Sequence, residues 1–410
     1  MIEVSQIIPY IFLFAALYFQ IFLLLTFFEN REMIGKRVSR TSTHYPSVAV
    51  LVPCYNEEKT VAGTVESLFS LDYPKDKLHI VIIDDGSTDS TFEVMKTFEY
   101  HPQVTLLQKE NGGKYTALNL GLSLTNTELV GCLDADSFVA SNALIEIVKC
   151  FDDATIMAVM PAIKIWNPKT VLERMQKAEY DMGIFVRKMF GIMNTIQVTP
   201  GAFSLFRKRV FDELGGFKEA HNTEDMEIAL RMQSNHYRIE NAHMAHVYTV
   251  APNTIRALYN QRIRWTYGFL KNVLDYRFML FNKKYGHLGI LTLPFAIASI
   301  IGAVYMAGFV VINFANYMLE KIVKFQTVGF QWDGIGVDWF FLNTQSLPIL
   351  IIFTLVTTLL ILVNGKKLSG GTMKPSRDIL YFLLLYGLMA PMWLTKALYN
   401  SALSKKSSWK

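Results

Sequence analysis

The sequence predicts an α/β domain with a mixed, mostly parallel sheet, joined to an α-helical transmembrane region. Between residues 45 and 250, short apolar runs alternate with segments of helical spacing, which is the pattern of strand–helix–strand units. The 410 residues are 51% hydrophobic, with a mean hydropathy of +0.24, and the excess gathers at both ends. We expect an N-terminal span (1–30), a cytoplasmic α/β domain (45–250), amphipathic interfacial helices (251–286) and a C-terminal membrane region (287–410).

The first apolar stretch, residues 7–28, is long enough to cross a bilayer, which takes about 20 apolar residues. A cleaved signal peptide is the alternative, but it would need a basic segment first, and only Glu3 precedes this run. Basic residues follow the stretch directly, at Arg31, Lys36, Arg37 and Arg40. The positive-inside rule therefore places the N-terminus outside and the next domain in the cytoplasm of a multi-pass plasma-membrane protein.

Four buried strands are expected in the first half of the domain, because each is a short apolar run that ends in polar residues. They span 47–52, 79–83, 104–107 and 129–133, with helices at 57–70, 88–98 and 114–124. The second half is less regular, with a strand at 156–165, a long helix at 171–193, a loop at 199–207 leading into a strand, and a helix whose N-cap is Thr223. Parallel strands bring their carboxyl ends to one crevice.

Residues 255–281 combine basic and aromatic side chains with apolar ones at helical spacing, which is typical of a helix in the membrane interface. Further spans are expected at 288–314, 347–363 and 379–398, the last interrupted by Pro391. An alternating count leaves the basic tail outside, at Lys405, Lys406 and Lys410. Either the last segment is re-entrant around Pro391, or another segment lies in the linker 315–346, which holds Trp332 and Trp339.

Charge and cysteine content exclude some classes of protein. The formal net charge is +5 without a long Lys/Arg run, so nucleic acid is not an expected partner, while a mild basic excess suits a membrane surface. The three cysteines, Cys54, Cys132 and Cys150, lack the spacing of a zinc site or of a disulfide framework. We expect them to be reduced core residues of a cytoplasmic domain.

The strongest chemical signal stands at the end of the run 129–133, where Asp134 and Asp136 lie one residue apart. Alternate residues of an extended chain point the same way, and two like charges held together need a cation or donors to compensate them. Such oxygens suit Mg²⁺ or Mn²⁺ bridging to substrate phosphates. Taken alone, the pair is better explained as a solvated turn or a helix N-cap, so its neighbours decide its meaning.

Other strand ends carry polar residues too. Asp84 and Asp85 offer acceptors to a base or a ribose, while Tyr55 and Glu57 offer a stacking ring and a polar contact. Each of these groups alone is better explained as a turn. Lys114 stands at a helix N-terminus, where the helix dipole disfavours a cation, so an anionic ligand such as a diphosphate would give it a purpose. An ordinary exposed lysine explains Lys114 equally well.

Two later motifs add a carboxylate pair and a basic, aromatic turn. Glu224 and Asp225 open a helix, where a carboxylate can serve as general base or stabilise the helix dipole. Gln261, Arg264 and Trp265 fall within about one helical turn. An arginine can neutralise a leaving diphosphate, and an indole can stack on a sugar ring. Without the other motifs, a basic interfacial helix would be the preferred interpretation.

In this order, the motifs resemble those of the membrane-embedded, processive family-2 glycosyltransferases, which include cellulose, chitin, hyaluronan and poly-N-acetylglucosamine synthases. The shared motifs are Asp-Asp-Gly-Ser, Asp-x-Asp, Thr-Glu-Asp and Gln-x-x-Arg-Trp, and the likeness covers roughly residues 45–285. Any one motif is weak, whereas four in order are specific. The resemblance implies a GT-A (nucleotide-diphospho-sugar transferase) fold that binds a UDP-sugar with Mg²⁺ or Mn²⁺.

The resemblance also implies roles for single residues. Contacts to the uridine would come from Asp84, Asp85, Tyr55 and Glu57. Asp136 would bind the metal with support from Asp134, and Lys114 and Arg264 would hold the diphosphate. Asp225, with Glu224 beside it, would be the base that deprotonates the acceptor hydroxyl. Trp265 and Gln261 would line the acceptor site.

A single catalytic carboxylate without a second nucleophile suits one inverting displacement, which gives a β-linkage from an α-linked donor. We expect a processive β-glycosyltransferase that extends an extracellular polysaccharide from a UDP-sugar, with UDP-N-acetylglucosamine as first choice, and assists its export. A partner subunit or a homo-oligomer would complete the channel, and membrane lipid surrounds the spans. The alternatives are a non-processive enzyme acting on polyprenyl phosphate or diacylglycerol, and a transporter or scaffold with an inactive domain.

Overall fold

The computed structural model describes residues 4–35, 44–329 and 346–403. Several residues that entered the topology argument lie outside the described residues: Lys36, Arg37, Arg40, Trp332, Trp339, Lys405, Lys406 and Lys410.

An eight-stranded sheet forms the centre of the α/β domain, in the order β3-β2-β1-β4-β7-β6-β8-β5. Its first half consists of β1 (Val48–Cys54), β2 (Leu78–Asp84), β3 (Val104–Gln108) and β4 (Leu129–Cys132). Neighbouring strands in this half are parallel. Alternate residues of β1 enter two different apolar clusters, Val50 and Val52 on one face and Leu51 on the other. Burial on both faces explains the continuous apolar runs, and the four expected strands are confirmed.

The second half makes the sheet mixed. It consists of β5 (Ser137–Val139), β6 (Ile156–Ile165), β7 (Ser204–Arg207) and β8 (Arg238–Thr249). β7 runs antiparallel to β4 and β6, whereas β8 is parallel to β6 and antiparallel to β5. The sequence predicted β6 and β7 but neither β5 nor β8. β5 has only three residues, and β8 mixes buried residues with half-exposed polar ones, so neither forms an apolar run.

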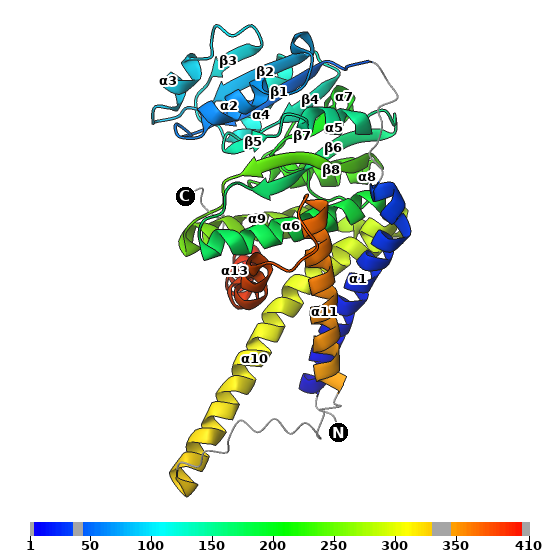
Figure 1. Ribbon diagram of the computed structural model, residues 1–410, viewed down its shortest axis with the longest axis vertical. Coiled ribbons are helices and arrows are strands. Elements are labelled where there is room, and N and C mark those ends of the chain that lie inside the picture. The colour runs from blue at the N-terminus through cyan, green and yellow to red at the C-terminus, as the bar shows by residue number, and fades with distance from the viewer. Residues whose placement is uncertain (1–3, 36–43, 330–345, 404–410) are drawn as a thin grey trace.

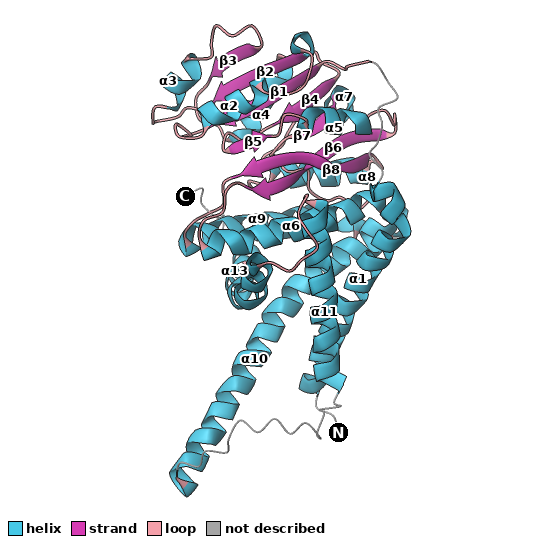
Figure 2. Cartoon of the chain, viewed as in Figure 1, coloured by secondary structure: helices cyan, strands magenta, loops and turns pink. Residues whose placement is uncertain are grey.

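Helices cover both faces of this sheet, as Figure 2 shows. They are α2 (Val61–Phe69), α3 (Thr91–Lys96), α4 (Lys114–Ser123), α5 (Ala143–Cys150), α7 (Lys208–Leu214) and α8 (Glu224–Ser234). α2, α3, α4 and α8 were expected from the sequence, whereas α5 and α7 were not. Cys54 and Cys132 are buried, Cys150 is half-buried, and all three are free thiols. Two of the three thus lie in the core as expected, and their reduced state stays a prediction.

Two longer helices form a layer beneath the sheet, α6 (Val171–Ile192) and α9 (Ile255–Asp275). Both run across the base of the domain in Figure 1, between the sheet and the apolar helices. α6 begins with a capping box in which Thr170 and Glu173 satisfy each other's backbone N–H groups. α9 is shorter than the expected 255–281, because the chain continues after Asp275 in short 3-10 turns. This transverse layer holds the α/β domain against the membrane region.

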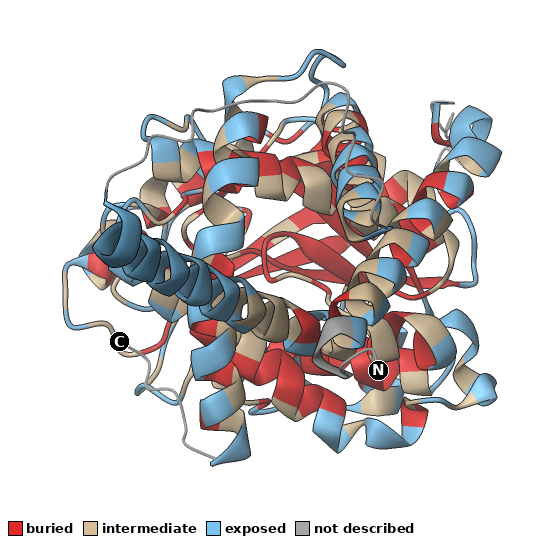
Figure 3. Cartoon of the chain, turned by 90° about the horizontal axis from the view of Figure 1, so that it is seen from below, coloured by how far each residue is buried: buried red, intermediate tan, exposed pale blue. Residues whose placement is uncertain are grey.

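Four apolar helical segments are long enough to cross a membrane, as the sequence predicted. They are α1 (Val4–Gly35), α10 (Leu293–Val328), α11 (Ser346–Leu368) and the segment α12–η5–α13, which spans Arg377–Tyr381, Phe382–Tyr386 and Gly387–Ala402. α1, α10 and α11 point away from the sheet (Figure 1). The outer half of α10 is exposed on all sides, as Figure 3 shows. An apolar helix without a protein partner needs lipid around it, so the chain is a membrane protein.

The expected interruption at Pro391 is wrong, because α13 runs through this residue without a break. A proline leaves the carbonyl four residues earlier without its usual partner. That carbonyl belongs to Gly387, the first residue after the π-helical turn η5. The wider turn just before this position gives the proline ring room.

Candidate active site

The expected crevice lies where three neighbouring parallel strands end. β2, β1 and β4 are adjacent, and their register pairs Cys54 with Asp84 and Leu51 with Cys132. The segments that follow these strands therefore leave the sheet at one edge. Glu57 and Asp136 are close enough for the charge of one to shift the pKa of the other. The strand-end acidic residues thus share one edge, as the sequence predicted.

Asp84 lies at the end of β2 and its side chain is 0% exposed. One carboxylate oxygen accepts the backbone N–H of Ser87 at 3.1 Å, and the other accepts the side-chain amide of Gln108 at 3.1 Å. Both oxygens are therefore occupied by the chain itself. Asp84 fixes the turn after β2 against the end of β3, which shapes the wall of the crevice.

Asp85 is also buried, and a lysine that the sequence analysis did not single out compensates its charge. Its Oδ1 accepts from Lys109 Nζ at 2.6 Å and from the backbone N–H of Gly112 at 3.1 Å. Gly86, next in the chain, has a positive φ of 73°, and a Cβ there would lie 2.7 Å from the backbone nitrogen of Asn111. Only glycine fits this close approach of two loops.

The end of β1 contributes Tyr55 and Glu57. The ring of Tyr55 is 36% exposed, which leaves a face free for stacking. The Glu57 carboxylate accepts the hydroxyl of Thr60 at 2.7 Å. Asn56 between them has a positive φ of 57°, and its side-chain oxygen accepts the backbone N–H of Thr88 at 2.8 Å. These contacts hold the loop after β1 beside the loop after β2.

Lys114 is the centre of a charge cluster. Its Nζ lies 2.7 Å from Asp134 Oδ1 and 3.0 Å from Glu224 Oε1. Burial opposes the charged form of Lys114, but the carboxylates of Asp134, Glu224 and Asp225 outweigh it and hold its pKa above the usual range. Lys114 thus joins the starts of α4 and α8 to the end of β4, which brings together residues 110 positions apart in the chain.

The loop that leads into β7, expected at 199–207, approaches this cluster. A Cβ on Gly201 would lie 2.5 Å from Lys114 Nζ and 2.6 Å from Asp134 Oδ1. The hydroxyl and the backbone N–H of Thr199 donate to the backbone carbonyl of Asp225, at 2.9 and 3.1 Å. The loop therefore touches the charge cluster at one point and the start of α8 at another.

Asp225 is poised to accept a proton near neutral pH. Burial and the neighbouring Glu224 carboxylate raise the pKa of Asp225 to about 7, although Lys114 partly opposes the shift. A base whose pKa lies near the working pH is well matched to proton transfer. A carboxylate with this pKa can take up a proton at neutral pH, and the role of Asp225 as general base stays a prediction.

Thr223 occupies the N-cap position of α8, but the expected capping bond is absent. Its hydroxyl donates to the carbonyl of Ala220 at 2.9 Å and accepts from the side-chain amide of Asn272 at 2.8 Å. A Cβ on Gly268 would lie 2.3 Å from the Thr223 hydroxyl. A tertiary partner on α9 replaces the local cap, because α9 packs too closely for the hydroxyl to turn inward. This contact ties α8 to α9.

Asp136 carries a charge that its surroundings compensate only in part. Burial, Asp134 and Glu57 raise the pKa of Asp136 to about 6, while the hydroxyl of Ser137 donates to its carboxylate at 3.1 Å. Within residues 4–35, 44–329 and 346–403, no group of three or more His, Cys, Asp or Glu side chains could hold a metal by itself.

The motif on α9 is organised by Arg262, which the sequence analysis did not select. Arg262 is buried and donates to Glu179 of α6 at 2.8 Å. Its guanidinium lies 4.4 Å from the centre of the Trp265 ring, and the hydroxyl of Tyr386 donates to the same glutamate at 3.3 Å. Within the described part of the chain, the buried Oε1 of Gln261 has no hydrogen-bond partner. Arg262 thus packs against the Trp265 ring, and the Gln261 oxygen lies buried beside them without a partner among the described residues.

Not every predicted residue joins one contact network. Lys114, Asp134, Glu224 and Asp225 form a single cluster, with Asp136 and Glu57 next to it. Asp84, Asp85 and Tyr55 stand on the neighbouring strand ends. Gln261, Arg264 and Trp265 lie on α9, which reaches the cluster through the contact between Asn272 and Thr223.

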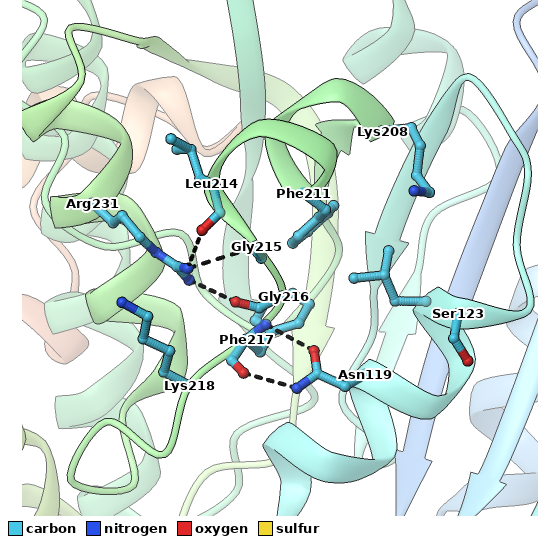
Figure 4. A pocket seen from close by; sticks show the side chains of 11 residues that line it. Asn119, Ser123, Lys208, Phe211, Leu214, Gly215, Gly216, Phe217, Lys218 and Arg231 are labelled. Carbon is cyan, nitrogen blue, oxygen red and sulfur yellow. Dashed lines mark hydrogen bonds between the residues drawn. The ribbon is translucent and has the colours of Figure 1, made fainter.

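A cavity of about 460 Å³ lies elsewhere, between α4, α7 and α8 (Figure 4). Its Arg231 donates to the carbonyls of Leu214 and Gly216, each at 2.8 Å, and to Glu227 at 2.9 Å. Asn119 holds Phe217 through two bonds of 2.8 Å. These polar groups serve the loop after α7, and none of the predicted site residues lines the cavity.

One protein family matches part of the α/β domain. Residues 49–215, fewer than half of the chain, are similar to the family Glycosyl transferase family 2. The matched range contains β1 to β4 and the loop at 199–204. It includes Lys114 and Asp134 of the charge cluster, whereas Glu224 and Asp225 lie beyond it.

The curated relatives include synthases of one polysaccharide. A poly-β-1,6-N-acetyl-D-glucosamine synthase of Staphylococcus epidermidis strain ATCC 35984 is 30% identical over 261 residues, covering 62% of this chain and 63% of the relative. A protein of the same name from Staphylococcus aureus strain COL is 31% identical over 246 residues, covering 58% of each chain. The match thus spans less than two thirds of the length of these relatives.

A solved structure matches nearly the whole fold. A mannosyltransferase from Pyrobaculum calidifontis, in complex with GDP-Man and Mn²⁺, superposes with a TM-score of 0.63 at 20% identity, covering 98% of this chain and 100% of that chain. The fold is therefore the GT-A domain with an attached helical region that the sequence predicted.

Proposed function

We propose that the chain is a membrane-bound, inverting glycosyltransferase that extends a polysaccharide processively from a UDP-sugar, with UDP-N-acetylglucosamine as donor. The observation that carries the proposal is the cluster of Lys114, Asp134, Glu224 and Asp225 beside the strand-end crevice. The names of the staphylococcal relatives support the choice of sugar and of a polymeric product. We assign the regions as predicted: 1–30 spanning, 45–250 catalytic and cytoplasmic, 251–286 interfacial, and 287–410 in the plasma membrane.

Donor binding would use residues that follow β1 and β2 for the uridine, and two basic side chains for the diphosphate. Asp84 and Asp85 hold the loops that would enclose the uridine, and the exposed Tyr55 ring would stack on it, with Glu57 nearby. Lys114 and Arg264 would hold the diphosphate. Lys114 forms ion pairs with two carboxylates in the structure, and a donor diphosphate would bind the same ammonium group.

The residues fit a divalent cation shared with the donor. Asp136 and Asp134 supply carboxylate oxygens, and the pKa of Asp136 is raised by its burial first and then by the charges of Asp134 and Glu57. Mg²⁺ and Mn²⁺ accept a site of one or two carboxylates completed by phosphate oxygens and water. Asp136 would be the ligand, with Asp134 in support. A bound cation would stabilise the charge on the departing diphosphate.

The transfer step follows from the position of Asp225. Its carboxylate takes the proton of the acceptor hydroxyl while that oxygen forms a bond to the anomeric carbon. The bond from this carbon to the diphosphate oxygen breaks on the opposite face, and UDP leaves with its charge held by Lys114 and Arg264. One displacement inverts the configuration, so an α-linked donor gives a β-linked product.

The acceptor would lie along α9. Trp265, supported from behind by Arg262, offers a flat surface for a sugar ring, and the unpartnered oxygen of Gln261 offers an acceptor for a sugar hydroxyl. This set of residues favours a carbohydrate acceptor over the alternative, a polyprenyl phosphate or diacylglycerol. An accessory subunit or a homo-oligomer would complete the export path next to the spans.

Purified full-length protein incubated with a panel of UDP-sugars, with either Mg²⁺ or Mn²⁺, tests the proposal. We expect UDP release to be strongest with UDP-N-acetylglucosamine and the product to be a long, β-linked polymer. A product of one sugar on a lipid would replace the polymerase by the alternative. No stimulated UDP release from any UDP-sugar would overturn the proposal.

A further inference from the structure

The fourth apolar segment, α12–η5–α13, runs in a different direction from the other three. α1, α10 and α11 extend along the length of the molecule in Figure 1, whereas α13 is seen end-on, just beneath α9. A helix that crosses the bilayer together with its neighbours would lie roughly along them. α13 lies across them.

The inner face of this segment follows the transverse layer along its whole length. Near its start, Ile379 and Phe382 pack in a cluster with Met175 of α6 and Leu258 of α9. In its middle, Ala390 and Trp393 pack on Ile263 of α9. Near its end, Leu398 packs against a cluster that contains Met226 and Leu230 of α8 and Phe269 of α9.

These contacts exclude a perpendicular course. A helix of 26 residues is roughly 39 Å long. If it crossed the bilayer, only one of its ends would reach α6, α9 and α8 at the base of the α/β domain. Both ends and the middle reach this layer, so the axis of the segment runs parallel to the layer.

The outer face is mostly apolar. Its exposed residues include a row that lies four apart, Leu380, Leu384, Leu388 and Met392, of which Leu388 is the most open at 74% exposed. The row ends at the exposed Lys396. The mean hydropathy of the segment is 1.4, against 2.4 to 2.6 for the other three. One apolar stripe on a less hydrophobic helix is typical of a helix that lies in a membrane surface.

We propose that residues 377–402 lie in the plane of the membrane on the side of the α/β domain, with the stripe of Leu380, Leu384, Leu388 and Met392 in the lipid. The lipid contact is continuous with that of α10, because α13 packs against α10 beside it. Of the described helices, only α1, α10 and α11 then cross the bilayer. Leu403, the last described residue, lies on the side of the α/β domain, so an alternating count no longer conflicts with the basic charge of the sequence that follows it.

Depth measurements with spin labels test the proposal. Single cysteines replace Leu384, Leu388 and Met392 in full-length protein in lipid vesicles, and wild-type protein measures labelling of its own buried or half-buried thiols. Accessibility to oxygen and to a water-soluble nickel complex gives the depth of each label. An in-plane helix places all three labels at one shallow depth. A spanning helix changes the depth by roughly 6 Å for every four residues.

α11 provides the matched control. Its exposed residues Ile352, Val356 and Leu360 are also four apart, and α11 crosses the bilayer in this account. The labels on α11 must therefore differ in depth. If the labels on α13 show the same gradient as those on α11, the proposal is wrong.

The side of the chain end gives an independent test. Leu403→Cys reports on the end of α13, Tyr100→Cys marks the α/β domain, where this side chain is 93% exposed, and Val328→Cys marks the far end of α10. A membrane-impermeant maleimide applied to sealed vesicles should label Leu403→Cys and Tyr100→Cys from the same side, and Val328→Cys from the other. Labelling of Leu403→Cys together with Val328→Cys would overturn the proposal.

Discussion

The two ends of the candidate site balance their negative charges differently. At the nucleotide end, Asp84 and Asp85 are buried, and their oxygens are met by backbone N–H groups, an amide and Lys109. At the reaction end, several carboxylates gather around Lys114, and the pKa values of Asp136 and Asp225 are raised to about 6 and 7.

This difference separates the part of the site that keeps the fold in shape from the part that would carry out the reaction. A carboxylate whose charge is met by donors from the chain itself stabilises the fold, and its surroundings keep their shape with or without a ligand. Carboxylates that repel one another are costly in the free protein and become favourable when a cation and a diphosphate arrive. The predictions below test whether the two ends separate in this way.

The largest effect is expected from Asp225→Asn. Without the base, the acceptor hydroxyl keeps its proton, so the turnover number for UDP release should fall by about 10²–10⁴-fold while donor affinity stays near that of the wild type. Asp212→Asn, on the exposed side of α7, is the matched control and should leave turnover unchanged. Turnover of Asp225→Asn close to that of the wild type would show that the base is misassigned.

The next largest effect is expected from Asp136→Ala. Loss of a metal ligand should weaken binding of the UDP-sugar by roughly ten- to a hundredfold and flatten its dependence on Mn²⁺ concentration. Chelation of divalent ions should remove most transfer by the wild type and change little more in the variant. Titration of donor against metal measures both effects, and donor affinity unaffected by the substitution would count against Asp136 as the ligand.

A smaller effect is expected from pH. Asp225 must be ionised to take a proton, and its pKa is raised to about 7, so UDP release should rise with pH from 5.5 to about 7.5 and then level off. Below the pKa, each pH unit should change the rate by about tenfold. The residual UDP release of Asp225→Asn should not rise with pH over this range. A rise that persists in the variant would assign the titration to another group.

Gly201→Ala should have the smallest effect on activity. Its new methyl group would meet Lys114 Nζ and Asp134 Oδ1, and the flexible end of the lysine can move aside, so we expect a loss of about tenfold or less in kcat/KM. Gly308→Ala is the matched control, because a Cβ there meets nothing within 4 Å. Equal activity of the two variants would show that the loop does not need its close approach to the cluster.

The elements that the sequence predicts best are the strands that are buried along their whole length. The four parallel strands are apolar runs because they are covered on both faces, and their ends place the site. β8 escapes prediction because its residues alternate between core and surface, and polar residues interrupt the pattern. The predicted carboxylates could be found because their motifs are local in the sequence.

The supporting residues could not be found in this way. Glu179 and Arg262 are 83 residues apart and meet only because α6 and α9 pack together. Thr223 occupies its expected place, but its hydroxyl bonds to Asn272 of α9 and not to its own helix. Lys109 is the exception, since it directly follows β3, and a search of every strand end would have selected it.

Thermal unfolding of the ligand-free protein tests the difference between the two ends most directly. Asp85→Asn removes the charge that compensates Lys109 and should lower the Tm by a few °C, on the order of 1 kcal/mol. Asp225→Asn should raise the Tm. The sign follows from linkage: a carboxyl whose pKa is raised in the folded state costs stability as pH rises through about 7, so the gain should be larger at pH 8 than at pH 5. Equal loss of stability in both variants would contradict the account.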